Sequence, residues 1–324
     1  MSLSISIKSL SIGVIIAVII AIILLAIRDI RPKAVVANKK QLWQAPSTHD
    51  LAPTTEGELI RYGEKLVTNT SHYLGPRGVV GVLSNGMNCQ NCHLAAGTRP
   101  YGNNYSAVFS TYPKFRARSG MVEDVYKRVN DCIERSLNGT SLDTGSREMK
   151  ALSAYINWLG KNVPKNSKPA GAGITDLAFL GRAADPGKGG LLYIQKCQVC
   201  HGKQGEGLSA ADSGCYTYPP LWGDHSYTTS AGLFRISRFA GYVKDNMPFG
   251  ASHDTPQLTD EEAWDLAAFV NSQPRPDKRF KGDWPDIAGK PVDHPFGPYA
   301  DSFSEKQHKF GPFGPIPPPG RHHS

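Results

Sequence analysis

Two copies of a five-residue pattern carry the most distinctive chemistry in this sequence. Cys89-Gln-Asn-Cys92-His93 and Cys197-Gln-Val-Cys200-His201 both read Cys-x-x-Cys-His. Two thiols one helical turn apart can each add to a vinyl group of a porphyrin, and the adjacent imidazole then reaches the iron. A thioredoxin-like redox pair does not need the histidine, and a zinc site needs further ligand pairs at suitable spacing. The sequence therefore predicts two covalently bound haems c, held by Cys89, Cys92, His93, Cys197, Cys200 and His201.

Each iron has a second axial position, and Met247 is the candidate for the second haem. Pro248 prevents a helix from continuing past this residue, so the thioether stands on a loop flanked by polar residues and glycine. Such a methionine is an unusual core residue, so we expect Met247 to bind iron. Ligation by histidine and methionine raises the reduction potential of a haem.

The first repeat has no Met-Pro pair after its motif, and a lone thiol is the alternative ligand. Cys132 lies in a stretch whose apolar spacing predicts a helix over residues 121–139, with Gly139 as its stop. Spacing leaves three roles open for Cys132: an iron ligand, a buried structural thiol, or one half of a disulfide with Cys215.

Amphipathic helices are predicted on both sides of each motif. Residues 60–67 and 190–196 precede the two motifs, residues 149–159 follow the first, and a helix that begins at Thr259 follows the second. Thr259 and the glutamate three residues later have the spacing of a capping box. Strand patterns are scarce, so the predicted fold class is all-α, with two tandem cytochrome c-type domains.

The chain has 324 residues, which suggests two domains at roughly 100–200 residues per domain. The predicted segments are an N-terminal membrane anchor or signal at 1–33, a first cytochrome c domain at 50–163, a linker at 164–184, a second domain at 185–275 and an extended proline-rich tail at 276–324. Because the tail has no sustained apolar period, it is either draped over the domains or partly disordered.

Composition narrows the class of partner. Apolar residues make up 40% of the chain and charged residues 20%, which excludes a disordered protein. The formal net charge is +8, so the surface favours anionic partners. The ordinary aromatic content, 9%, gives no support for a nucleic-acid stacking platform, and we expect no nucleic-acid partner.

The N-terminus predicts the compartment. Residues 9–27 are uncharged and apolar, long enough to nearly span a hydrocarbon core of roughly 30 Å, which predicts a transmembrane anchor. The alternative is a signal peptide cleaved near Ala37. The positive charges mostly follow this stretch, which by the positive-inside rule would leave the chain in the cytoplasm. Attachment of haem to Cys-x-x-Cys-His takes place outside the cytoplasmic membrane, and we give that more weight: the expected location is the periplasmic side.

Several strings resemble one enzyme family. They are Val129-Asn-Asp-Cys-Ile-Glu-Arg-Ser-Leu-Asn-Gly139, Pro219-Pro-Leu-Trp-Gly-Asp-His-Ser-Tyr227, Asn246-Met-Pro-Phe-Gly250, Pro298-Tyr-Ala-Asp301 and Gln307-His-Lys-Phe-Gly-Pro312. Together they resemble the di-haem thiosulfate dehydrogenases that form tetrathionate. The resemblance covers roughly residues 55–315, hence both repeats and the tail.

The resemblance implies roles for individual residues. Cys132 would be the distal ligand of the first, catalytic haem, and Met247 that of the second. Arg118, Arg128 and Ser136 fall where the family has two cations and a hydroxyl beside the ligating cysteine. Cys215 has no role in the resemblance.

The implied reaction joins two thiosulfate ions into tetrathionate, or runs in reverse, and passes electrons to a small cytochrome c or another extracytoplasmic acceptor. Two rival functions use the same motifs. One is a di-haem electron carrier without enzymatic activity, in which Cys132 is merely packed. The other is a di-haem peroxidase, which needs an iron with an open position.

Overall fold

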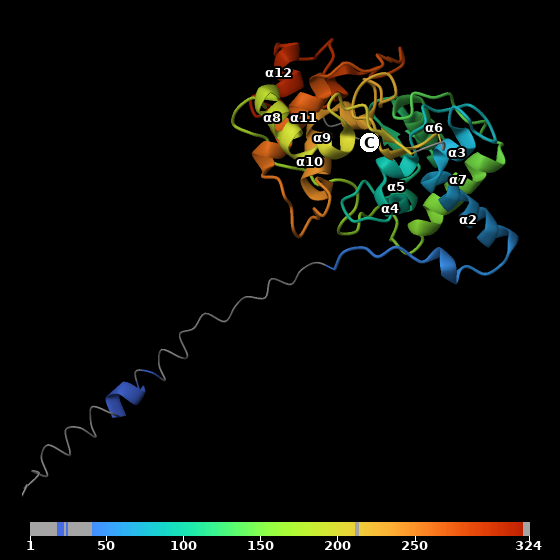
Figure 1. Ribbon diagram of the computed structural model, residues 1–324, viewed down its shortest axis with the longest axis horizontal. Coiled ribbons are helices and arrows are strands. Elements are labelled where there is room, and N and C mark those ends of the chain that lie inside the picture. Colours follow the sequence, from blue (N-terminus) through green and yellow to red (C-terminus); the bar gives the residue numbers. More distant parts are fainter. Residues whose placement is uncertain (1–17, 23, 25–40, 211–213, 320–324) are drawn as a thin grey trace, which may run out of the picture. The chain divides into compact units, whose positions relative to one another are not determined.

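The computed structural model describes residues 18–22, 24, 41–210 and 214–319 (Figure 1). Of these, residues 42–210 and 214–319 belong to one compact unit, and residues 18–22, 24 and 41 belong to a separate one. The anchor expected within 1–33 lies almost wholly outside the described residues, of which 18–22 and 24 are helical. Within the described ranges, no helix has both the length and the apolar character to cross a membrane.

The first repeat is built on α2 (Thr55–Thr68) and α7 (Arg147–Leu159), which pack closely against each other. A Cβ on Gly63 would lie 2.1 Å from the carbonyl oxygen of Ala151, so the helix backbones can meet only because this residue is glycine. Leu66 and Met149 are completely buried at this contact. Burial of such a side chain stabilises the fold by about 1.5–3 kcal/mol.

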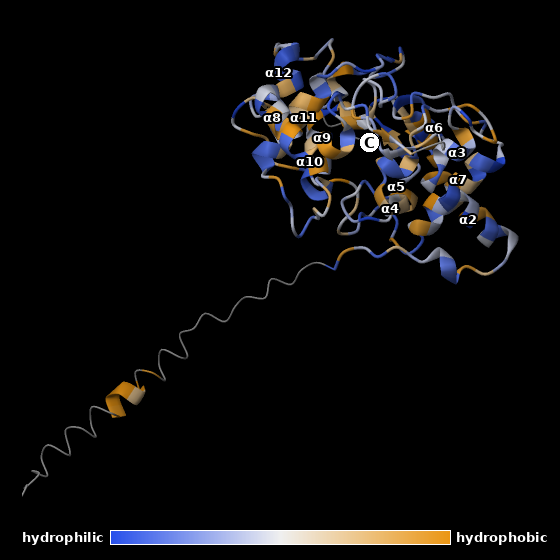
Figure 2. Cartoon of the chain, in the orientation of Figure 1, coloured by the Kyte–Doolittle hydropathy of each residue, from blue (hydrophilic) through white to orange (hydrophobic). Residues whose placement is uncertain are grey.

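The second repeat uses the same construction. α8 (Pro186–Lys196) packs on α11 (Asp260–Ser272), where a Cβ on Gly189 would lie 1.9 Å from the carbonyl oxygen of Asp265. α10 (Ile236–Asn246) completes the bundle. The predicted capping box at Thr259 and Glu262 is confirmed. Apolar residues concentrate along α10 and α11, as their colours show (Figure 2).

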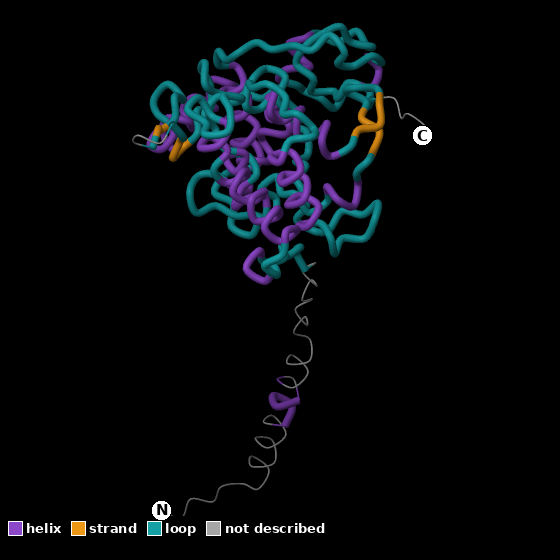
Figure 3. Tube along the Cα trace, turned by 90° about the vertical axis from the view of Figure 1, so that its right-hand side faces the viewer, coloured by secondary structure: helices purple, strands orange, loops and turns teal. Residues whose placement is uncertain are grey.

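Apart from α6, the remaining elements are short. The helices are α3 (Thr70–Leu74), α4 (Leu94–Gly97), α5 (Val108–Thr111), α6 (Val125–Arg135), α9 (Gln198–His201) and α12 (Glu305–Phe310), with 3-10 turns at Thr48–Asp50, Cys89–Asn91, Gly232–Phe234 and Ile287–Gly289. Strand β1 (Lys114–Arg116) pairs antiparallel with β2 (Met121–Glu123), and β3 (Leu208–Ser209) with β4 (Tyr216–Tyr218) (Figure 3). The fold is thus mostly helical, but the all-α expectation missed these two hairpins.

The expectation of one helix over 121–139 was also wrong. Met121 lies in β2, and α6 begins at Val125 after an extended Asp124, whose carboxylate accepts a hydrogen bond from Lys127 N at 2.8 Å. This cap ends the strand and starts the helix. Val122, whose spacing fits the apolar face of such a helix, instead pairs with Phe115 in the hairpin and is 68% exposed. The helix ends at Arg135, before Gly139.

The tail packs over the helices. This was one of the two arrangements expected from the sequence. Phe313 and Ile316 are buried in the core of the second repeat. Asp293 is buried and accepts hydrogen bonds from Arg235 Nε at 2.8 Å and from Ser237 Oγ at 2.5 Å. These contacts fix the tail to the start of α10.

The two repeats share an interface. Met87 and Leu137 of the first repeat belong to the core of the second. Tyr242 on α10 donates from its hydroxyl to Asn91 O, inside the first haem motif, at 3.1 Å. Tyr101 stacks on His253 with ring centroids 3.9 Å apart. The first motif is therefore packed against the helix that precedes Met247.

Candidate active site

Both predicted attachment motifs have a geometry that suits a haem iron. His93 Nδ1 lies 2.5 Å from Asn103 O, and His201 Nδ1 lies 2.9 Å from Pro219 O. A carbonyl on Nδ1 fixes the ring and leaves Nε2 available to a metal. Burial lowers the pKa of His93 to about 4 and also lowers the pKa of His201, so both imidazoles are in the neutral form that binds iron.

The thiols of the first motif are half-buried. Burial raises the pKa of Cys89 to about 11 and that of Cys92 to about 12. For both thiols, the neighbouring Cys132 acts in the same direction. The fold therefore brings Cys132 of α6 close to the first attachment motif, although more than thirty residues separate them in the sequence. Cys132 forms no disulfide in the described part of the chain, so the pairing with Cys215 is not realised.

Arg128 lies beside Cys132, one turn earlier on α6. The pKa of Arg128 is raised, and the largest cause is its electrostatic interaction with Cys132. Ser136 follows Cys132 by one turn, caps the C-terminal end of α6 and donates its backbone N–H to Cys132 O at 2.8 Å. Two of the three predicted substrate residues thus flank the thiol on one helix.

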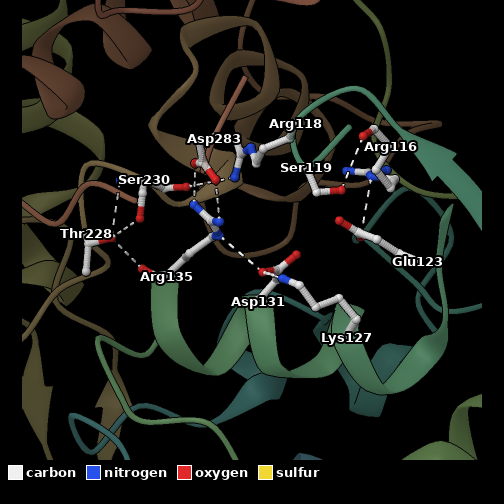
Figure 4. Close-up of polar contacts among 10 residues, drawn as sticks. All are labelled: Arg116, Arg118, Ser119, Glu123, Lys127, Asp131, Arg135, Thr228, Ser230 and Asp283. Carbon is white, nitrogen blue, oxygen red and sulfur yellow. Dashed lines mark hydrogen bonds and ion pairs between the residues drawn. The ribbon is translucent and has the colours of Figure 1, made fainter. Parts of the chain in front are cut away.

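Arg118 is placed differently. It lies on the loop between β1 and β2, where its Nη1 donates to Ser230 O at 3.0 Å and its guanidinium lies over the Trp284 ring. Figure 4 shows it beside the pair formed by Arg135 and Asp283. Burial, together with the charge of Arg135, lowers the pKa of Arg118 to about 10. Arg118 is therefore at the edge of the Cys132 region, on the side of the tail.

The hairpin supplies side chains that the sequence analysis missed. Tyr112 is buried, and its hydroxyl has no hydrogen-bond partner among the described residues. Burial raises the pKa of Tyr112, and Arg128 and Cys132 are close enough to interact with it electrostatically. Glu123 is buried, and its Oε2 has no hydrogen-bond partner in the described part of the chain but forms an ion pair with Arg116 Nε at 4.0 Å. Burial lowers the pKa of Lys114 to about 8. No local signal marks these residues, because only the unpredicted β1–β2 pairing brings them to Arg128.

Met247 follows α10 directly, and the predicted helix stop at Pro248 is confirmed. Its side chain is half-buried and packs against the core of the second repeat, which contains the second attachment motif's Cys197 at its edge. The preceding Asn246 is buried and donates to Tyr101 O at 3.1 Å. The Met247 loop is therefore tied to both repeats.

Comparison with known proteins decides the family. Residues 82–164 match the family described as "SoxA/TsdA, cytochrome c domain", and residues 187–274 match "Cytochrome c". A thiosulfate dehydrogenase of Psychrobacter arcticus is 36% identical over 251 residues, which are 77% of this chain and 73% of that protein. One of Allochromatium vinosum is 38% identical over 224 residues, 68% of this chain and 79% of that protein. The chain belongs to the thiosulfate dehydrogenase family.

A solved structure agrees with this membership. The thiosulfate dehydrogenase (TsdBA) from Marichromatium purpuratum, in its as-isolated form, superposes with a TM-score of 0.68 at 33% identity. The match covers 74% of this chain and 51% of that one, so this family member spans about half the length of the solved chain. Two cytochrome c domains within this family indicate that the protein is a di-haem cytochrome with two covalently bound haems c.

Proposed function

We propose that this family member oxidises two thiosulfate ions to one tetrathionate at the haem attached to Cys89, Cys92 and His93, with Cys132 as its distal ligand. The observation that carries the assignment is the placement of Cys132 and Arg128 against this motif. Haem, when bound there, supplies a one-electron acceptor. The balance is two thiosulfate dianions to one tetrathionate dianion, with release of two electrons, one to each haem.

The protein's own contribution is to bring two anions together. Two dianions about 5 Å apart repel by about 13 kcal/mol at an effective dielectric constant of about 20. Arg128, Arg118 and Lys114 offset this repulsion, and the planar guanidinium of arginine suits the oxygens of such anions. The unpartnered Tyr112 hydroxyl would donate to a substrate oxygen. Ser136, one turn after Cys132, would hold the same ion from the other side.

Met247 is proposed as the distal ligand of the second haem, attached to Cys197, Cys200 and His201. A thiolate lowers the potential of a haem and a thioether raises it, so haems held in this way would favour electron transfer from the first site to the second and on to an extracytoplasmic acceptor such as a small cytochrome c. The Tyr242–Asn91 hydrogen bond supports close spacing of the two sites, because it ties the first motif to the helix that precedes Met247.

The location is part of the proposal. We place the enzyme on the periplasmic side of the cytoplasmic membrane, held by the apolar stretch 9–27. Membrane pelleting that resists high salt but yields to detergent supports an anchor. Enzyme that is released with the periplasm, with an N-terminus near residue 38, would instead establish signal cleavage.

Two measurements test the function. Purified holoenzyme should reduce ferricyanide only when thiosulfate is added, with tetrathionate as product. Electron paramagnetic resonance of the ferric protein should show a thiolate-ligated low-spin centre. Two centres with only nitrogen and thioether ligands would identify an electron carrier, and a high-spin centre would identify a peroxidase.

A further inference from the structure

A cavity of about 280 Å³ lies beside Arg118, between the β1–β2 loop, residues 229–235 and the tail segment 278–298. The tail provides most of its wall. Its size is close to the lower end, about 300 Å³, of the range found for small-molecule sites. The attachment motifs, Cys132 and Met247 do not line it. We call it the tail pocket.

The wall of the tail pocket is positively charged. Its cations are Arg118, Arg235, Lys278, Arg279 and Lys290, and the one carboxylate that lines it is Asp283. Asp283 already binds both terminal nitrogens of the buried Arg135, at 2.6 and 2.7 Å (Figure 4). It therefore does little to compensate the other cations of the wall, of which Arg235 pairs with Asp293 and Arg279 with Asp277.

Three of these cations meet backbone carbonyls and aromatic faces, and within the described ranges no carboxylate binds them. Lys278 Nζ donates to Gly139 O at 2.9 Å. Lys290 Nζ donates to Phe296 O at 3.2 Å and to Pro298 O at 2.8 Å. Arg118 donates to Ser230 O. Carbonyls orient a cation but do not neutralise it, so an anion could still gain from these charges.

The pKa values of two titratable groups in the wall agree with a positive electrostatic potential in the pocket. Burial lowers the pKa of His294 to about 4, and three cations of the wall act in the same direction. Burial also lowers the pKa of Lys290. A bound anion would relieve both effects, because it favours the charged forms of its neighbours.

Position gives the pocket its ligand class. Arg118 lines the tail pocket. It is close enough to Arg128, the neighbour of Cys132, for the two guanidinium charges to interact. We infer that the tail pocket binds a dianionic sulfur oxyanion, thiosulfate or tetrathionate, at a second site next to the one beside Cys132. This inference rests on the proposed function for the identity of the anion.

The test is calorimetric titration of the ferric holoenzyme with tetrathionate, which stays intact because ferric haem holds no electron to donate. The variant is Lys278→Gln with Lys290→Gln. The matched control is Lys203→Gln with Lys306→Gln, two exposed lysines whose side chains form no hydrogen bond or ion pair among the described residues. Loss of two charge-assisted contacts should weaken tetrathionate binding about tenfold or more, and the control should bind like the parent.

A second variant guards against misfolding. The side chain of Arg279 is 61% exposed, pairs with Asp277 at 3.2 Å and lies over the Phe296 ring, so Arg279→Gln loses only surface contacts, should fold normally and should weaken binding less. Equal affinity in the parent, the double variant and Arg279→Gln would overturn the inference. Failure of the proposed function would look different: thiosulfate would reduce neither haem of the parent enzyme, whatever tetrathionate binding showed.

Discussion

At the scale of single residues, the role of the Cys132 thiol distinguishes an enzyme from a simple electron carrier. Replacement by methionine leaves both attachment motifs intact, so Cys132→Met should retain two haems, measured by the pyridine haemochrome. Thiosulfate oxidation should fall by about a hundredfold or more, as when a group that acts in the transition state is lost. Cys215→Ser is the control, with full activity. Undiminished turnover in Cys132→Met would exclude an essential thiolate.

Tyr112 separates a binding role from a structural one. Its hydroxyl is buried without a partner among the described residues, so Tyr112→Phe removes no hydrogen bond from the free protein and should leave the melting temperature unchanged or raised. If the hydroxyl donates to thiosulfate, kcat/KM should fall about tenfold. A lower melting temperature with unchanged kcat/KM would show that the hydroxyl is structural.

Lys114 predicts a pH dependence. Its pKa is lowered to about 8 by burial, with nearby Arg116 acting in the same direction, so it is protonated below that pH and neutral above it. Since the protonated form attracts thiosulfate, KM should rise as pH increases through about 8. Lys114→Arg should remove this inflection, because arginine keeps its charge. Lys114→Gln should have a high KM at every pH; a KM that falls with rising pH in the parent would contradict the assignment.

The sequence predicts the attachment residues fully, because cofactor attachment needs thiols and imidazole at fixed local spacing. It predicts Cys132 only through a family resemblance, since helical spacing alone also fits a packed thiol. Tyr112 and Glu123 could not be predicted as site residues from the sequence. Their chemistry comes from burial beside Arg128, which depends on tertiary contacts.

At the scale of elements, the link between α6 and the tail carries a clear energetic prediction. Arg135 is 6% exposed and binds Asp283 through two hydrogen bonds. Asp283→Asn removes the carboxylate that binds both terminal nitrogens and leaves this guanidinium with only Asp131, 3.4 Å from its Nε, so it should lower the free energy of unfolding by about 2 kcal/mol. Denaturant titration measures the loss. Asp277→Asn, at an exposed tail pair, is the control and should cost about 0.5 kcal/mol or less.

Helices with local start and stop signals could be predicted from the sequence, except in the segment 121–139. Thr259 caps α11 as its spacing indicated. In the segment 121–139 the apolar residues also fit a helical period, yet β1 competes for its first three residues. Strand pairing is a contact between segments, so the periodicity of one segment cannot reveal it.

At the scale of the whole molecule, the net charge of +8 and the cationic wall of the tail pocket favour the same kind of ligand. The tail is therefore more than an extension of the second repeat, because it covers the Arg118 side of the first. Such an arrangement should draw anions toward the catalytic haem over distances longer than a contact.

Ionic strength tests this attraction. The Debye length falls from about 30 Å at 0.01 M salt to about 10 Å at 0.1 M, so the second-order rate of haem reduction by thiosulfate should fall several-fold over this range. Stopped-flow absorbance measures the rate without an anionic acceptor. Reduction by a neutral hydroquinone should change little. Sodium sulfate at matched ionic strength should inhibit more than sodium chloride, since a dianion also competes for the sites; equal inhibition would mean that screening alone acts and that no site prefers dianions.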